Sequence, residues 1–140
     1  MLILALLLGV AFGPCGDPVA ESMSWRVLTG TVEAVEPDGE LRLVNVAEWT
    51  RPTFPRTVRM ADVEPSPAAQ PVLKKLIGRK IDVWVNPRTA DDAHVVGVVY
   101  RGKEDVNRTL LRRGLGRYVE PAAYAMSDYT SCEHRIAARK

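Results

Sequence analysis

Five short runs of alternating apolar residues, with a helical segment between the third and the fourth, constrain the fold of this chain most. The first two lie in Ser24–Val46, on either side of the turn Pro37-Asp38-Gly39, where glycine accepts a positive φ. The other three lie in Thr57–Val63, Lys80–Asn86 and Ala93–Val106. Five short strands in a chain of 140 residues predict one domain, built as a small closed barrel with added helices.

Three segments are expected to be helices. Ala68–Gly78 carries apolar residues at helical spacing and should end at its glycine; these residues are Val72, Leu73, Leu76 and Ile77. Asp105–Gly116 is a shorter helix with an aspartate as N-cap and Gly114 as C-cap, and its core-facing residues are Leu110 and Leu111. The tail Tyr124–Lys140 predicts a last helix whose basic end suits the helix dipole.

The chain begins with an apolar run, Leu2–Phe12, that is typical of the core of a secretory signal and is short for a bilayer span. We expect residues 1–22 to be a signal peptide or an N-terminal apolar anchor, and residues 23–140 to be the folded domain. The protein is then exported and is periplasmic, extracellular or membrane-anchored. Cys15 and Cys132 can pair if this segment is retained, whereas Cys132 is a lone thiol if the segment is removed past Cys15.

The stretch "DVNRTLLRRGLG", which follows "VVGVVYRGKE", resembles a signature of the staphylococcal-nuclease (thermonuclease-like) family. In that family a strand that ends in tyrosine leads through a turn to a Val-Asn-x-x-Leu-Leu/Val-x-x-Gly-Leu-Ala helix. The segments "VRMADVEPSP", "LKKLIGRKIDVWV" and "CEHRIAARK" are similar to further family segments in the same order, from about Val27 to the C-terminus. The resemblance implies a mainly β fold with helices, a five-stranded OB-type barrel that carries about three helices.

The family's activity is calcium-dependent hydrolysis of DNA and RNA phosphodiesters. This chemistry requires carboxylates for the cation, a glutamate that activates water, and two arginines that neutralise the phosphate. Arg59 matches the first arginine, and Glu64 stands where the family usually has an aspartate that binds the metal. The other metal ligand falls on Gly39, so Asp38 or Glu40 could replace it only if the turn shifted by one residue.

At two further positions of the family's site, this chain has residues that cannot perform the catalytic role. Pro67 stands at the general-base position and His94 at the second arginine. A proline transfers no proton, and a neutral imidazole replaces a bidentate guanidinium poorly. Because losing a general base or a charge clamp typically costs a factor of about 10² to 10⁴ each, the sequence predicts a catalytically degenerate domain. Arg59 is also open to a purely structural role, as an ion pair with Asp62 or Glu64.

Nucleic-acid binding needs a local basic patch, because a net charge of +2 gives no strong global attraction. The candidates are Arg108, Arg112, Arg113, Arg117 and Tyr118, which follow one another along the helical segment after the fifth strand. Acidic neighbours dilute this patch, so a solvated helix face is the alternative. The tryptophans Trp25, Trp49 and Trp84 match no site of the family.

Three hypotheses follow. The first is an exported, degenerate thermonuclease-like domain that acts as a nucleic-acid-binding or interaction module. The second is a weak calcium-dependent phosphodiesterase whose metal site is rebuilt from Asp38, Glu40 and Glu64. The third is a protein-interaction domain without a nucleic-acid role. No cofactor is expected, except calcium if activity is retained. The expected partners are single-stranded nucleic acid or a protein. The chain is expected to be a monomer that contacts membrane only through its N-terminal segment.

Overall fold

The computed structural model describes residues 14–16, 26–119 and 128–139. Apart from residues 14–16, the predicted N-terminal signal or anchor lies outside the described residues, as does its boundary with the domain at residues 22–23. Among the residues that are described, no helix has the length and the apolar character needed to span a membrane.

Five strands close into a barrel. They are β1 (Arg26–Val35), β2 (Leu41–Glu48), β4 (Arg56–Met60), β6 (Lys80–Val85) and β7 (His94–Arg101). Around the barrel the order is β1, β2, β4, β7 and β6, and β6 pairs with β1 to complete the circuit. All neighbours are antiparallel except β4 and β7, which run parallel. This is the topology of an OB-type barrel, so the predicted fold class is confirmed.

Short strands complete the sheet structure. β3 (Arg51–Pro52) pairs antiparallel with the end of β2, and β8 (Glu104–Asp105) pairs antiparallel with the end of β7. Outside the barrel, β5 (Val63–Pro65) pairs with β9 (Gly116–Tyr118) as a separate two-stranded sheet. This small sheet was not predicted, and it brings the segment after β4 next to the segment after the second helix.

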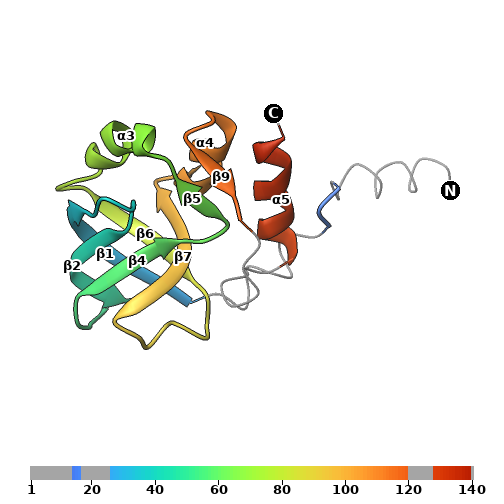
Figure 1. Ribbon diagram of the computed structural model, residues 1–140. Coiled ribbons are helices and arrows are strands. Elements are labelled where there is room, and N and C mark those ends of the chain that lie inside the picture. The colour runs from blue at the N-terminus through green and yellow to red at the C-terminus, as the bar shows by residue number, and fades with distance from the viewer. Residues whose placement is uncertain (1–13, 17–25, 120–127, 140) are drawn as a thin grey trace, which may run out of the picture.

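The helical elements are η1 (Pro67–Ala69), α3 (Gln70–Lys74), α4 (Val106–Arg112) and α5 (Asp128–Ala138). Figure 1 shows α3 over one end of the barrel, and α4 and α5 side by side next to it. Asp105 caps α4 as predicted, because its side chain accepts a hydrogen bond from the backbone N–H of Arg108. The helix ends at Arg112, so Arg117 lies on β9 and not on the helix to which the sequence assigned it.

One predicted helix is shorter than expected. The helix in Ala68–Gly78 ends at Lys74, and the chain then continues in turns whose amides bond three residues back. Leu73 and Leu76 are buried as predicted, but Ile77 is 45% exposed. Because Ile77 lies past the end of the helix, in a bridge with Val32 of β1, it no longer shares the helix's buried face.

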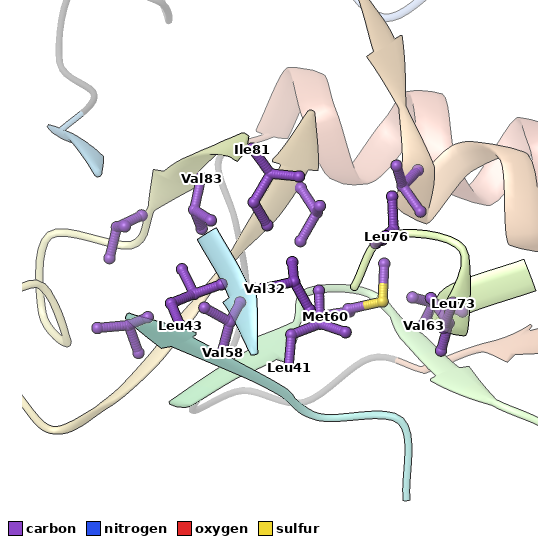
Figure 2. Close-up of a cluster of buried hydrophobic side chains, with 14 of the residues drawn as sticks. Val32, Leu41, Leu43, Val58, Met60, Val63, Leu73, Leu76, Ile81 and Val83 are labelled. Carbon is purple, nitrogen blue, oxygen red and sulfur yellow. The ribbon is translucent and has the colours of Figure 1, made fainter. Parts of the chain in front are cut away.

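Apolar side chains from the inward faces of the strands fill the barrel (Figure 2). Val58 and Met60 of β4 and Ile81 and Val83 of β6 alternate with outward-facing neighbours, as the period of two requires. Leu110 and Leu111 join this core from α4, as predicted. The core also receives Leu73, which closes the end of the barrel under α3.

Asn107 anchors α4 to the barrel. Its fully buried side chain accepts a hydrogen bond from the Val99 amide at 3.0 Å and donates to the carbonyls of Ala61 at 2.8 Å and Gly97 at 3.2 Å. All three partners are backbone groups of strands or strand ends, so one amide side chain connects β4, β7 and α4.

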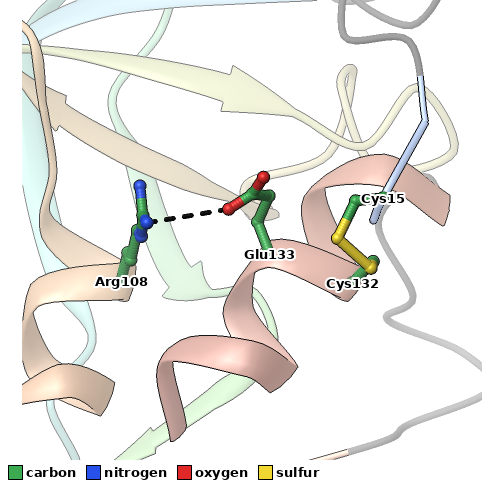
Figure 3. The surroundings of a disulfide bond; sticks show 4 residues. All are labelled: Cys15, Arg108, Cys132 and Glu133. Carbon is green, nitrogen blue, oxygen red and sulfur yellow. Dashed lines mark ion pairs between the residues drawn. A yellow bond between two sulfur atoms is a disulfide. The ribbon is translucent and has the colours of Figure 1, made fainter. Parts of the chain in front are cut away.

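A disulfide attaches the N-terminal segment to the last helix. Cys15 bonds to Cys132 on α5 across 117 residues of sequence, so the pairing that the sequence left open is present (Figure 3). The next residue of α5, Glu133, lies 3.7 Å from the guanidinium of Arg108 on α4. Covalent and ionic contacts therefore both hold α5 in place.

Candidate functional site at the end of the barrel

A cavity of about 250 Å³ lies at the end of the barrel where β1 turns into β2. The turn contributes one wall, and β4 and β5 contribute the other; the lining residues are Asp38, Gly39, Glu40, Arg59, Met60, Val63, Glu64 and Pro65. The structure thus brings Asp38, from the turn, next to Arg59 and Glu64, which the sequence analysis took from a single later segment. Arg59 is exposed on the outer face of β4.

The turn itself is closed to a new side chain. Gly39 has a φ of +92°, and a Cβ at this position would lie 2.7 Å from Cγ of Pro65. The Asp38 carboxylate accepts a hydrogen bond from the Glu40 amide at 3.0 Å, which is the local bond of an ordinary turn. Position 39, to which the resemblance assigned a metal ligand, therefore has no room for a carboxylate in this backbone conformation.

Glu64 is bonded to an arginine. Its Oε2 atom accepts hydrogen bonds from Arg117 Nε at 2.9 Å and from Arg117 Nη2 at 2.6 Å, because the two residues face each other in the β5–β9 pairing. Both side chains are more than half exposed, so the pair contributes little to stability, at most about 1 kcal/mol. Its effect on the site is larger, because a guanidinium occupies the carboxylate that would otherwise attract a cation.

The donor set does not fit calcium. Calcium takes six to eight oxygen ligands, usually with several carboxylates. Within the described ranges, no three His, Cys, Asp or Glu side chains come together in a group that could hold a metal ion. Asp38, Glu40 and Glu64 border one cavity, but they do not converge on a common point.

Pro67 and His94 are the residues that the resemblance aligned with the general base and the second arginine. Pro67 begins η1, where its fixed φ and missing N–H suit the first position of a helix. His94 is exposed at the start of β7 and pairs with Thr57 in the parallel register, two positions before the residue that pairs with Arg59. It does not line the cavity.

A buried polar cluster, which was not predicted from the sequence, lies where α5 meets the barrel. His134 is fully buried, and its two ring nitrogens each lie 2.7 Å from a carboxylate oxygen, Nδ1 from Asp62 and Nε2 from Asp105. The Ser131 hydroxyl donates to Asp62 at 3.0 Å. Asp62 is therefore bonded to α5, and this replaces the structural ion pair with Arg59 that the sequence suggested for it.

The two carboxylates keep His134 charged. Burial alone would lower the pKa of the imidazole, but the hydrogen bonds and negative charges of Asp105 and Asp62 outweigh it and raise the pKa to about 9. With both ring nitrogens donating, the histidine is an imidazolium that connects the end of β4 to the N-cap of α4. We call His134, Asp62, Asp105 and Ser131 the histidine clamp. Its role is structural, because His134 is closed to solvent.

The arginines proposed for nucleic-acid binding do not form one patch. Arg108 and Arg112 line a second, mixed-charge cavity of about 400 Å³ between α4 and α5, which also contains Glu104 and Glu133. Arg113 follows the helix, and Arg117 is bonded to Glu64. Tyr118 is half-buried and packs against the core, so its ring does not stand free for stacking.

The chain was compared with known proteins at the level of sequence. No protein-family model matches it, and no curated protein matches it at a significant level.

Proposed function

We propose that this chain is a thermonuclease-like domain that binds single-stranded nucleic acid without hydrolysing it. The observation that carries the proposal is the closed ligand position at Gly39, where Pro65 fills the space that a metal-binding carboxylate needs. Two further observations also argue against hydrolysis. Arg117 forms an ion pair with Glu64, and a proline stands at the general-base position. A site that has lost its cation and its base but keeps an exposed arginine supports binding and not turnover.

The binding surface we propose is the outer face of β2 and β4. In OB-type barrels the second and third strands, with the loops between strands one and two and between strands four and five, hold oligonucleotides. Here those strands are β2 and β4, and Arg59 projects from β4 next to the first of the two loops. Arg108 and Arg117 lie off this face, on α4 and on β9.

We further propose that the domain works outside the reducing cytoplasm. The support is the Cys15–Cys132 disulfide, since structural disulfides persist in oxidising compartments, together with the apolar run at the N-terminus. The disulfide also requires that any cleavage of the N-terminal segment spares Cys15. Intact mass measurement of the protein recovered from the exported fraction tests both points; a mature chain that begins after Cys15, or a protein found reduced in the cytoplasm, would contradict them.

Hydrolysis is tested with labelled single-stranded DNA and RNA in the presence of calcium. We expect no cleavage above a control without protein, for the wild type and for Glu64→Gln alike. Cleavage that a chelator and Glu64→Gln both abolish would overturn the proposal and favour the rebuilt metal site.

Binding is tested by fluorescence anisotropy with a labelled oligonucleotide at several salt concentrations. Arg59→Ala should weaken binding and reduce its salt dependence by about one phosphate contact. The matched control is Arg101→Ala, an exposed arginine at the end of β7, beyond the segment that pairs with β4. If Arg108→Ala and Arg112→Ala weaken binding and Arg59→Ala does not, the surface lies on α4 instead. If the wild type does not bind, the protein-interaction hypothesis takes precedence.

A further inference from the structure

The most exposed large apolar side chain of the described residues is Trp49, at 84%. It lies in the two-residue turn between β2 and β3, where Glu48 pairs with Arg51. Its φ of +58° is in the left-handed region, which is rare for a bulky residue and costs about 1 to 2 kcal/mol. A tryptophan in this turn is unfavourable both for its backbone and for its exposure, and such outliers occur where a side chain has a function.

A second exposed ring, Phe54, lies on the same connection between β2 and β4. It is 46% exposed, and the guanidinium of Arg56 lies 3.7 Å from the centre of its ring. Arg56 is itself buried and fixed, because it donates to the Asp92 carbonyl at 3.1 Å and to the Thr53 hydroxyl at 3.0 Å. The guanidinium therefore holds Phe54 as a preformed platform, which reduces the entropy lost when a planar ligand stacks on it. We call Trp49 and Phe54 the aromatic ledge.

The charged side chains around the aromatic ledge favour a ligand that is held by stacking on the two rings over a ligand that is held by electrostatic attraction. Glu48 and Asp91 both bond to Arg26, at 2.7 and 3.1 Å, so this guanidinium offsets one of their two negative charges. Arg51 is exposed next to Trp49 and forms no ion pair with another described residue. Insertion into a membrane would bring the carboxylate of Asp91, which is 83% exposed, close to the lipid, and this opposes it.

The ledge also lacks the extent of a protein interface. Polar residues, Thr50, Arg51 and Thr53, separate the two rings, whereas a stable protein contact buries about 800 Å² on each partner. Two exposed rings on one connection, with an arginine between them in the sequence, carry the two kinds of group that hold a single strand, namely aromatic faces for bases and a cation for phosphate.

The position of the ledge connects it to the surface proposed above. Arg56 begins β4, and its contacts with Ala90 and Asp92 bring the ledge next to the loop between β6 and β7, the fourth and fifth strands of the barrel. Phe54 and Arg59 are five residues apart, roughly 17 Å along an extended strand. This span lies within the length of single strand that one OB fold covers, about 4 to 16 nucleotides.

We propose that Trp49 and Phe54 stack on bases of a single-stranded nucleic acid whose backbone also contacts Arg59. This inference rests on the proposed function and assigns the residues that recognise bases. The nucleic acid runs from the cavity at the β1–β2 turn along the outer face of β4 to the aromatic ledge.

The test compares two ligands of about 12 nucleotides, a thymidine oligonucleotide and an abasic strand of the same length, bound by Trp49→Ala, Phe54→Ala and Arg59→Ala. Ile77→Ala is the matched control, because Ile77 is also an exposed apolar residue (45%) but lies on the turn after α3. Each ledge variant should weaken binding of the thymidine strand by roughly 5- to 100-fold and leave binding of the abasic strand unchanged. Arg59→Ala should weaken both.

Three results would overturn the inference. If the ledge variants bind the thymidine strand like the wild type while Arg59→Ala does not, stacking is absent and the proposed function still stands. If the ledge variants lose the same affinity for both strands, Trp49 and Phe54 do not act through bases. If the wild type binds neither strand, the inference and the proposed function fail together. Thermal melts of each variant show that the fold is retained.

Discussion

Gly39 determines what the turn between β1 and β2 can hold. Its positive φ disfavours any other residue, and its contact with Pro65 leaves no space for a Cβ. Gly102 also has a positive φ, of +62°, but nothing lies within 4 Å of the Cβ that would be added there. The two glycines therefore separate the effect of backbone strain from the effect of crowding.

We predict that Gly39→Ala lowers the free energy of unfolding by roughly 2 to 4 kcal/mol, because strain and overpacking add. Gly102→Ala should lower it by about 1 to 2 kcal/mol, from strain alone. Urea unfolding curves of both variants provide the measurement. Equal losses would mean that Pro65 gives way easily, and the ligand position would then be open to a carboxylate after all.

His134 makes stability depend on pH. Its pKa is raised to about 9 in the folded protein, compared with about 6.5 in an unfolded chain. The folded state therefore holds a proton that the unfolded state releases between these values. The stabilisation is complete below about pH 6.5 and is lost as pH rises towards 9, at up to about 1.4 kcal/mol per pH unit.

We predict that His134→Gln removes this decline and makes the free energy of unfolding nearly flat from about pH 6.5 to 9. The control is His94→Gln, because His94 is exposed on β7 and should leave the decline intact. Chemical unfolding at a series of pH values provides the measurement. A wild-type curve that rises over this range would show that the histidine clamp does not hold the proton.

At the scale of elements, α4 carries a core leucine directly before a surface arginine, so variants of the two residues distinguish the contribution of packing to stability from that of surface charge. Leu111 is 3% exposed in the core, whereas Arg112, one residue later, faces solvent. Leu111→Ala should lower the free energy of unfolding by roughly 2 to 5 kcal/mol, and Arg112→Ala by less than about 0.5 kcal/mol. Thermal melts of both variants test this; a large loss for Arg112→Ala would make that arginine structural.

Elements with strong local signals were predictable, and contacts between distant segments were not. Alternation in Lys80–Val85 and the aspartate cap of α4 act within a few residues, so they are visible in one sequence. The β5–β9 sheet has only three residues per strand, with proline and glycine among them, and shows no periodicity. Ile77 was misplaced because helical spacing continued past the residue where the helix ends.

In the candidate site, too, the contacts between distant segments were not predictable from the sequence. The resemblance led to Arg59, Glu64 and the Gly39 turn, because these follow family motifs in order along the chain. It did not show that Arg117 bonds to Glu64 or that Pro65 seals the turn, since both contacts depend on the fold. The histidine clamp joins residues 72 positions apart; its only local trace is that Ser131 and His134 are three residues apart on a helix.

At the scale of the whole molecule, the disulfide closes almost the entire domain into one loop. Chain-entropy estimates for a loop of about 100 residues give about 4 to 5 kcal/mol of stabilisation. We predict that Cys132→Ser lowers the free energy of unfolding by roughly 3 to 5 kcal/mol and speeds amide exchange in α5 before exchange in the barrel. Hydrogen exchange with mass spectrometry measures both. Unchanged exchange in α5 would show that the noncovalent contacts of this helix hold it without the disulfide.

The same loop decides how a pulling force would pass through the molecule. A tether that acts on the chain before Cys15 pulls on α5 through the sulfur bridge to Cys132, in addition to pulling on the backbone that continues from Cys15. The share of the load that reaches α5 falls on the contacts that hold this helix, among them the imidazolium between Asp62 and Asp105. If the N-terminus is held at a surface, α5 acts as a second mechanical anchor of the domain beside the backbone.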